Sequence, residues 1–214
     1  GPLLIVAGAG SGKTRTLTQR LAHLIQNGIP PRRIIAITFT NKAAGEMRSR
    51  VFQGHSPFAK SQEPFIGTFH SFGASILRRE GKPLGRTGNF VIFDADDSLK
   101  IVKKILRSLN LPERYSPPKV RYEISKIKNN LLDPAGLDDW LSQAFQEYEN
   151  ELRRQNAFDF DDLIQKVVEL LEIHPDVLKK YQNRFDYVLI DEYQDINLAQ
   201  YALVRLLSER HRNL

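Results

Sequence analysis

The amino-acid sequence predicts an α/β fold in which a parallel sheet is flanked by helices and carries an inserted α-helical subdomain. Three observations support this prediction. Apolar runs alternate with helical patterns up to residue 80, the alternation then stops, and an apolar run ending in two acidic residues returns near residue 190. We therefore assign residues 1–80 and 157–214 to the sheet domain and residues 81–156 to the insertion.

The first strand–helix unit has the pattern of a phosphate-binding loop. Residues 3–6 predict a buried strand, and a helical pattern with an apolar stripe covers residues 13–26. Glycine permits a loop whose N–H groups turn inward, and the helix adds its positive dipole end. Lys13 would reach the β- and γ-phosphates, and Thr14 would hold Mg²⁺. The loop itself consists of Ala7, Gly8, Ala9, Gly10, Ser11 and Gly12.

Ala7 departs from the usual pattern G-x-x-x-x-G-K-[ST], which has glycine at this position. We interpret the loop as a variant, because the remaining glycines still permit the tight turns. A glycine-rich turn that binds no ligand is the alternative interpretation. The Gly-Lys-Thr sequence at the expected offset argues against it.

Two further strand–helix units place aromatic residues where strands end. Residues 34–39 and 65–68 are apolar runs typical of buried parallel strands, and helical patterns follow both. Since open α/β sheets bind ligands at the carboxyl ends of their strands, Phe39, Phe69 and adjacent hydroxyls would form a groove suited to single-stranded nucleic acid. Core packing is the alternative for Phe69 and Phe72, and His70 could be a phosphate donor or a structural histidine.

The insertion consists of helical patterns over residues 96–109, 117–129 and 138–154, separated by proline-containing turns. The second of these helices could contact a duplex backbone, although a solvated basic face is the alternative. Its basic residues are Lys119, Arg121, Lys126 and Lys128. Residues 158–164 then return the chain to the sheet domain and predict the start of a helix with acids at its N-terminal end.

An apolar run after Asp186 ends in Asp191 and Glu192, which is the partner that a phosphate-binding loop requires. Asp191 can hold Mg²⁺ through water, and Glu192 can polarise the water that attacks the γ-phosphate. Paired acids after a strand can also be simple helix caps. The loop earlier in the chain favours the catalytic interpretation.

Composition limits the remaining classes of protein. The 214 residues include no cysteine, which excludes disulfides and thiolate metal sites, and 41% are hydrophobic, which suffices for a packed core. No apolar run approaches the roughly 20 residues that span a bilayer, and no basic region precedes the N-terminal run. We expect a cytoplasmic protein with no membrane partner.

The net charge of +6 is concentrated in the first third of the chain. Residues 1–80 carry 11 Lys and Arg against 3 acidic residues, whereas residues 157–214 carry 7 against 11. These basic residues are too many for one nucleotide, so a nucleic-acid backbone is the natural second partner. Solvated surface charge is the alternative. The residues concerned are Arg32, Arg33, Lys42, Arg48, Arg50, Arg78 and Arg79.

Together these stretches resemble the superfamily-one DNA helicases of the UvrD/PcrA/Rep type. The resemblance covers the whole chain and rests on five motifs in order. They are Ala-Gly-Ala-Gly-Ser-Gly-Lys-Thr, Ile-Thr-Phe-Thr-Asn-Lys-Ala-Ala, Gly-Thr-Phe-His-Ser, Phe-Asp-Phe-Asp-Asp-Leu-Ile and Asp-Glu-x-Gln-Asp. The resemblance implies a RecA-like P-loop NTPase core that uses ATP and Mg²⁺ to move along single-stranded DNA, with 3′-to-5′ polarity, and to unwind duplex at a junction.

By position, the resemblance also assigns roles to individual residues. Gln194 would sense the γ-phosphate and couple it to DNA, and Arg15 would lie near the nucleotide. The residues that would contact the DNA strand are Thr38, Phe39, Thr40, Asn41, Thr68, Phe69 and His70.

Measured against this family, parts of the motor are missing from the sequence. An upstream glutamine segment that reads adenine, a strand with a glutamine sensor, and a second core domain with arginine fingers are all absent. The missing strand would lie between the loop strand and the Asp-Glu strand. We therefore expect a helicase fragment that is inactive alone and whose partners include the remaining domains of its parent chain.

Two other functions fit the same residues. The chain could be the motor of a recombinational helicase–nuclease, or it could be a non-catalytic module that binds nucleotide and DNA without turnover.

Overall fold

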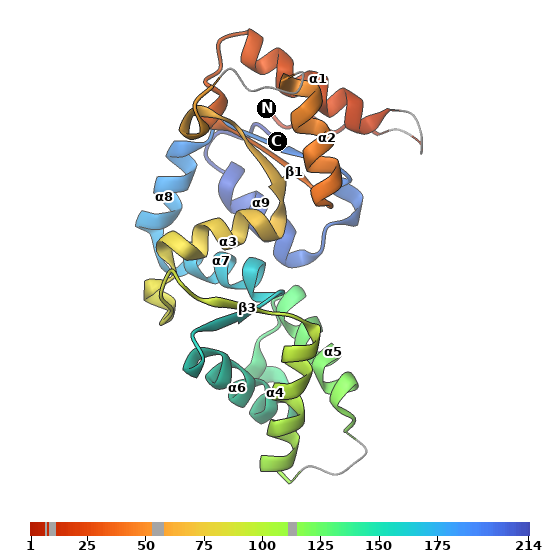
Figure 1. Cartoon of the computed structure of the whole chain (residues 1–214), viewed down its shortest axis with the longest axis vertical. Coiled ribbons are helices and arrows are strands. Elements are labelled where there is room, and N and C mark those ends of the chain that lie inside the picture. The colour runs from red at the N-terminus through yellow and green to blue at the C-terminus, as the bar shows by residue number, and fades with distance from the viewer. Residues whose placement is uncertain (7, 9–11, 53–57, 111–114) are drawn as a thin grey trace. The chain divides into compact units, whose positions relative to one another are not determined.

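The computed structural model describes residues 1–6, 8, 12–52, 58–110 and 115–214 (Figure 1). The chain divides into two compact units, which we describe separately. The sheet unit comprises Gly1–Phe72, Leu171–Ile196 and Tyr201–Leu214, and the helical unit comprises Gly73–Leu170 and Asn197–Gln200. The borders between these units therefore differ from the domain borders at residues 80 and 157 that the sequence suggested.

Three parallel strands form the sheet, in the order β2-β1-β5. They are β1 (Ile34–Thr38), β2 (Phe65–Thr68) and β5 (Tyr187–Ile190). All five residues of the central strand β1 are buried, as expected for a parallel strand covered on both faces. Thr38 is in register with Thr68, and Ile37 is in register with Ile190. The three strands therefore end at the same edge of the sheet, and the predicted α/β fold with a parallel sheet is confirmed.

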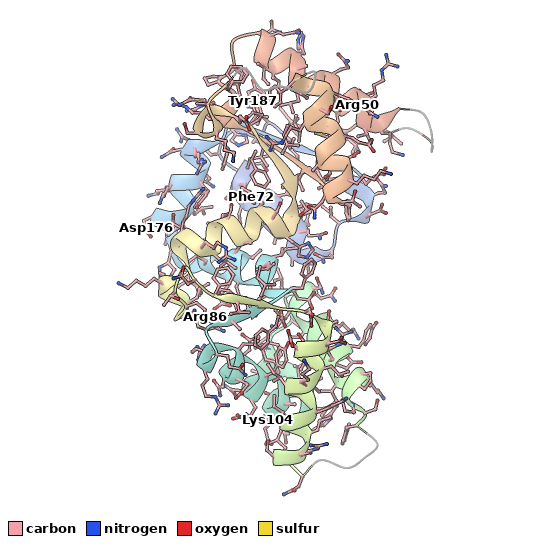
Figure 2. The ribbon with its side chains drawn as sticks, in the orientation of Figure 1. Arg50, Phe72, Arg86, Lys104, Asp176 and Tyr187 are labelled. Carbon is pink, nitrogen blue, oxygen red and sulfur yellow. The ribbon has the colours of Figure 1, made fainter. Side chains whose placement is uncertain are left out.

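Helices α1 (Lys13–Gln26) and α2 (Asn41–Phe52) pack on one face of this sheet and lie beside each other in Figure 1. Their shared core with the strands contains Leu21, Leu24, Ile34, Ala36, Ala44, Met47, Phe52, Ile66 and Leu189. On the other face, the Phe65 ring packs edge-to-face against Phe72, with 5.0 Å between the ring centroids. Phe72 is labelled in Figure 2. The further helices are α3 (Phe69–Glu80), α8 (Pro175–Arg184) and α9 (Leu198–Ser208).

The predicted buried strand over residues 3–6 is wrong. These residues belong to no strand, and their side chains are between 45% and 85% exposed. The C-terminal residues lie between them and β5, because Asn213 O accepts from Val188 N (3.0 Å) and Leu214 O accepts from Leu3 N (2.7 Å). A strand forms by laddered hydrogen bonds to a neighbour. Residues 3–6 have no such ladder of hydrogen bonds, so they form no strand although their side chains are apolar.

The helical unit is built on α4 (Ala95–Ser108), α5 (Pro117–Asn129) and α6 (Asp139–Arg154), so the three predicted helices are confirmed to within a residue. Their shared core includes Ile105, Ile124 and Tyr148. The unit also contains β3 (Val91–Phe93) and β4 (Ala157–Asp159), which pair in parallel and which the sequence interpretation missed. At three residues each, and with two of the β3 side chains exposed, these strands give almost no periodic signal.

Helix α7 (Asp162–Ile173) begins later than the sequence suggested. Asp159 Oδ1 accepts from Asp162 N (2.8 Å), and Asp162 Oδ2 accepts from Asp159 N (3.2 Å). This reciprocal pair satisfies backbone donors where β4 ends and α7 begins, as a capping box does. The acidic residues therefore cap the helix, as predicted, but residues 157–159 form a strand.

Lys128 was predicted as a possible duplex contact, and this prediction is wrong. Its side chain is fully buried, and its Nζ lies 2.8 Å from Asp159 Oδ2, 2.7 Å from Asp162 Oδ1 and 2.8 Å from Glu149 Oε1. We call these four residues the Lys128 cluster. A buried ammonium group is tolerated when carboxylates surround it, and here they hold α5 and α6 against the β4–α7 junction.

The pKa values in the Lys128 cluster follow from burial and charge together. Burial alone would lower the pKa of Lys128, but the surrounding carboxylates raise it well above its usual value. Burial and the Asp159 carboxylate raise the pKa of Tyr148. The Tyr148 hydroxyl therefore stays protonated and donates to Asp159 Oδ2 at 2.9 Å. The cluster thus combines ion pairs with a hydrogen bond from a neutral donor.

The remaining local structure consists of short turns of helix. They are 3-10 helices at Pro31–Arg33, Lys60–Gln62, Lys82–Leu84, Pro134–Gly136 and Tyr193–Asp195. Within the residues that the structure describes, no helix has the length and apolar character needed to cross a bilayer.

We predict that Lys128→Met destabilises the protein by about 3–5 kcal/mol, because it removes the positive charge from a buried group of carboxylates. Lys126→Met on the same helix is the matched control. Lys126 is half exposed and lies 3.9 Å from Glu123, so its loss should cost at most about 1 kcal/mol. Urea unfolding followed by circular dichroism measures both, and equal effects would contradict the structural role of the Lys128 cluster.

Candidate functional site

Lys13 and Thr14 occupy the first turn of α1, directly after the loop. Gly12 precedes them with φ 87°, a left-handed conformation that glycine adopts without the strain of a Cβ atom. The first helical hydrogen bond runs from Thr16 N to Gly12 O (2.9 Å). The N–H groups of this turn thus mark the positive end of the helix dipole, as expected for an anion site.

Asp191 and Glu192 follow β5 at the edge where the three strands end. The Asp191 N–H donates to Ile37 O (2.9 Å), so Asp191 is still held by the central strand. The chain then turns sharply, because Glu192 has a left-handed φ of 51°. A 3-10 turn containing Gln194 comes next, and the Asp195 N–H donates to Glu192 O at 3.0 Å.

These two stretches, 177 residues apart in the sequence, meet at one place. Thr14 Oγ1 donates to Asp191 Oδ2 at 2.9 Å. Lys13 Nζ lies 3.8 Å from Glu192 Oε2 and 3.5 Å from Gly8 O. Gln194 Nε2 donates to Glu192 Oε2 at 2.6 Å. The side chains that the sequence singled out for nucleotide, metal and catalysis therefore lie together in the sheet unit.

The oxygen atoms at this place suit Mg²⁺. A hydroxyl from Thr14 and a carboxylate from Asp191 are hard ligands, and Mg²⁺ usually binds one or two carboxylates while phosphates and water complete its shell. Among the described residues, no group of three His, Asp or Glu side chains could form an all-protein metal site. The donor set therefore fits a phosphate-bound Mg²⁺ better than a structural metal.

Part of the predicted nucleotide loop lies outside the described residues, namely Ala7, Ala9, Gly10 and Ser11. Gly8 lies within them, and its carbonyl oxygen faces the Lys13 ammonium group. Arg15 lies in the first turn of α1 with an exposed side chain. Its expected position near a nucleotide remains a prediction.

At the end of β1, the predicted DNA contacts divide by exposure. Thr38 is fully buried, and its hydroxyl donates to Thr40 O (3.0 Å). Thr40 Oγ1 accepts from Ala43 N at 3.1 Å and so caps the start of α2. Phe39 is 40% exposed, and Thr40 and Asn41 are exposed as well. These three residues are the ones that a ligand at this edge could reach directly.

At the end of β2, the neighbouring predicted contacts are mostly inside the protein. Thr68 is buried and exchanges hydrogen bonds with Ser71, and Phe69 is only 2% exposed. The Phe69 ring packs edge-to-face against Phe39, with 6.3 Å between the centroids. Phe72 is equally buried, and His70 is half-buried. Core packing therefore describes Phe69 and Phe72, and Phe69 supports the exposed Phe39 ring from beneath.

Several of the basic residues that suggested a polyanion have partners within the chain. Arg33 forms an ion pair with Asp186, and Arg48 Nη1 lies 2.6 Å from Glu63 Oε2. Arg78, in the helical unit, donates to Gly88 O (3.0 Å) and lies over the Phe90 ring. The Arg33–Asp186 ion pair thus offsets part of the excess charge in the first third, which weakens the inference of a nucleic-acid partner from composition alone.

A set of contacts that the sequence interpretation missed follows the catalytic candidates directly. Asn197 and Gln200 form a reciprocal cap at the start of α9, because each accepts the other's backbone N–H through its side chain (3.0 and 2.9 Å). The spacing of a capping residue followed three positions later by glutamine is a recognisable signal. It lies just after the Asp-Glu-x-Gln-Asp motif and marks the start of α9.

The fold and the site define an α/β protein with a parallel sheet and a candidate site at the carboxyl ends of its strands. Comparison with known families is more specific. Residues 1–214 match the family described as UvrD/REP helicase N-terminal domain, and the chain belongs to that family. The predicted resemblance is therefore confirmed.

Named relatives agree with the family. The chain is 45% identical to "ATP-dependent DNA helicase PcrA" of Leuconostoc citreum and of Bacillus subtilis, and 44% identical to the protein of that name in Staphylococcus epidermidis. Each match covers 100% of this chain and 30% of the relative. The chain thus spans about a third of the length of these relatives.

We predict that Thr14→Val weakens Mg²⁺-dependent nucleotide binding, because valine keeps the shape of threonine and removes the oxygen that faces Asp191. Thr87→Val is the matched control, since Thr87 lies in the helical unit and its hydroxyl accepts from Asn156 Nδ2 (2.8 Å). Titration of a fluorescent ATP analogue with and without Mg²⁺ measures both variants. The metal assignment is contradicted if Thr14→Val binds the analogue with the same Mg²⁺ dependence as the wild-type protein.

Proposed function

We propose that this chain is the ATP-binding core of an ATP-dependent DNA helicase, with a RecA-like P-loop fold. The observation that carries the proposal is the meeting of Thr14 with Asp191 (2.9 Å) and of Lys13 with Glu192 (3.8 Å) at the carboxyl edge of a parallel sheet. Membership of the helicase family and the names of the relatives support it. The sheet domain would be residues 1–80 and 157–214, with residues 81–156 as its helical insertion.

In the proposed site, each residue has one task towards the nucleotide. Lys13 would bind β- and γ-phosphate oxygens, and the N–H groups of the loop would donate hydrogen bonds to the remaining phosphate oxygens. Thr14 and Asp191 would hold Mg²⁺ from the protein side. The metal ion would supply neutralisation of the charge that develops on the phosphates. Arg15 would lie at the outer side of the same turn, near the nucleotide.

The hydrolytic step would depend on Glu192 and Gln194. The Glu192 carboxylate would accept a proton from the attacking water, as a general base does. Gln194 contacts Glu192 at 2.6 Å and could report the state of the γ-phosphate through this contact. The Lys13 ammonium group lies 3.8 Å from this carboxylate, and phosphate oxygens would compete for the same ammonium group.

Single-stranded DNA would bind at the same edge of the sheet, at Phe39, Thr40 and Asn41, with 3′-to-5′ translocation and duplex unwinding as the output. The Phe39 ring is exposed and is supported by the buried Phe69 ring, so it offers a firm surface for stacking a base. The buried residues Thr38, Thr68 and Phe69 would support this surface from inside the protein, and the half-buried His70 would lie at its margin. Duplex junctions and the rest of a longer parent protein are the further proposed partners.

The two alternative functions are less well supported. The relatives named above are helicases, and their names mention no nuclease. A non-catalytic module would not need a carboxylate placed like that of Glu192, beside Lys13 and next to a metal ligand. ATP hydrolysis measured for the parent protein would decide against this module.

We predict that Glu192→Gln in the parent protein slows ATP hydrolysis by about 10²–10⁴-fold and leaves ATP binding intact, because it removes the proton acceptor without changing the shape of the side chain. Glu209→Gln, at an exposed position directly after α9, is the matched control. Steady-state turnover together with equilibrium binding of ATP tests the prediction. Unchanged turnover in Glu192→Gln would contradict the catalytic assignment.

We predict that Phe39→Ala weakens binding of single-stranded DNA by about 1–3 kcal/mol with little dependence on base sequence, because one stacking surface is lost. Phe69→Ala should instead destabilise the fold by about 3–5 kcal/mol, since that ring is buried. Fluorescence anisotropy with labelled oligonucleotides and thermal unfolding separate the two effects. A Phe39→Ala protein that loses stability but binds DNA normally would show that Phe39 is structural.

A further inference from the structure

We propose that Asp195 is a positioning residue for the hydrolytic step, because its carboxylate fixes the orientation of the Gln194 amide that contacts Glu192. This inference rests on the proposed function and deepens it, since the site described above gives Asp195 no task. Every residue on which it depends lies in the sheet unit.

The Gln194 amide nitrogen lies between two carboxylates. It donates to Glu192 Oε2 at 2.6 Å and to Asp195 Oδ2 at 3.1 Å. A primary amide has two N–H donors on its nitrogen and only acceptor sites on its oxygen, and an ionised carboxylate only accepts. The reverse orientation of the amide would place Gln194 Oε1 against two carboxylate oxygens with no proton between them. The two carboxylates therefore select the orientation in which the amide nitrogen faces Glu192.

Asp195 supplies an acceptor that stays constant, whereas Glu192 changes during the proposed reaction. Once Glu192 has accepted the proton of the attacking water, it is a carboxylic acid with an O–H donor of its own. That donor fits a rotated amide, in which Gln194 Oε1 accepts. Asp195 takes no part in the proton transfer and remains an acceptor. It therefore favours the same orientation of the Gln194 amide before and after the step.

The contact between Gln194 and Glu192 gains importance when a nucleotide binds. Glu192 Oε2 lies 2.6 Å from Gln194 Nε2 and 3.8 Å from Lys13 Nζ. Phosphate oxygens would compete with Glu192 for the Lys13 ammonium group. Gln194 then remains as a donor to Glu192 Oε2, and Asp195 holds the amide that provides this donor. Since a general base must lie within hydrogen-bond distance of the water it activates, the orientation of this amide affects the rate.

The backbone brings residues 192 and 195 together without help from their side chains. Asp195 N donates to Glu192 O at 3.0 Å, and this bond closes the 3-10 turn Tyr193–Asp195. Side chains three residues apart lie on the same side of such a turn. The Asp195 side chain is exposed, so its removal leaves no cavity. Substitution of Asp195 should therefore leave the turn and the fold in place.

Two substitutions of Asp195 test the acceptor. Asp195→Asn keeps an oxygen that accepts from Gln194 Nε2, whereas Asp195→Ala keeps none. In the parent protein we expect Asp195→Ala to lower kcat for DNA-stimulated ATP hydrolysis at least about fivefold, with KM for ATP within about twofold of the wild-type value. We expect Asp195→Asn to retain at least about half of the wild-type kcat, because the hydrogen bond to Gln194 is kept.

A double variant shows whether Asp195 acts through Gln194. In a Gln194→Ala background the amide that Asp195 positions is gone, so adding Asp195→Ala should change kcat by less than about twofold. If Asp195 instead contacts the metal, the phosphates or DNA directly, the substitution lowers kcat by the same factor in both backgrounds.

Glu209→Ala is the matched control, because it removes an exposed carboxylate directly after α9, and its kcat should equal that of the wild type. Asp195→Leu also removes the acceptor and serves as the second variant if Asp195→Ala does not fold. For each protein, kcat, KM and the thermal unfolding temperature are measured together.

The outcomes separate the role of Asp195 from the function on which it rests. Wild-type parent protein without DNA-stimulated ATP hydrolysis would overturn the proposed function, and the role of Asp195 with it. An active wild-type protein with normal kcat in Asp195→Ala and in Asp195→Leu would overturn the positioning role alone. An equal loss of kcat in the wild-type and Gln194→Ala backgrounds would also overturn that role. So would a loss that accompanies a lower unfolding temperature and is not recovered in Asp195→Asn, because Asp195 would then be purely structural.

Discussion

The parallel pairing of β2, β1 and β5 is the constraint on which the rest of the sheet unit depends. Because the strands are parallel and in register, Thr38, Thr68 and Asp191 all leave the sheet at one edge. The backbone hydrogen bond from Asp191 N to Ile37 O holds Asp191 against the end of β1, at the candidate site. Polar side chains from distant parts of the sequence can meet at this edge, because it lies outside the apolar core of the sheet.

Much of this arrangement could be predicted from the sequence, and the exceptions have physical reasons. Apolar periodicity located α1, α5 and β1 correctly, and the motifs identified Thr14 and Asp191 as a pair before their contact was known. The run at residues 3–6 was misjudged, because hydrophobicity shows that a segment can be buried but does not show that a neighbouring strand is available.

Lys128 was misjudged for a different reason. It follows Ile124 by four residues and Ile127 by one, so helical spacing places it on the apolar stripe of α5, whereas its charge alone suggests a surface position. The hydrogen bond between Asn197 and Asn129 could not be predicted, since nothing in a single sequence indicates that these two side chains meet. Contacts between polar side chains far apart in the sequence produce no periodic pattern in it.

The left-handed backbone at Glu192 affects which substitutions would stabilise this turn. A residue with a Cβ atom in this conformation costs roughly 1–2 kcal/mol, and asparagine or glycine would adopt it more easily. Selection for stability alone would therefore remove the carboxylate. Under the proposed catalytic role, Glu192 places stability and activity in conflict at one peptide unit, and variants stabilised at this position should be recognisable by their loss of turnover.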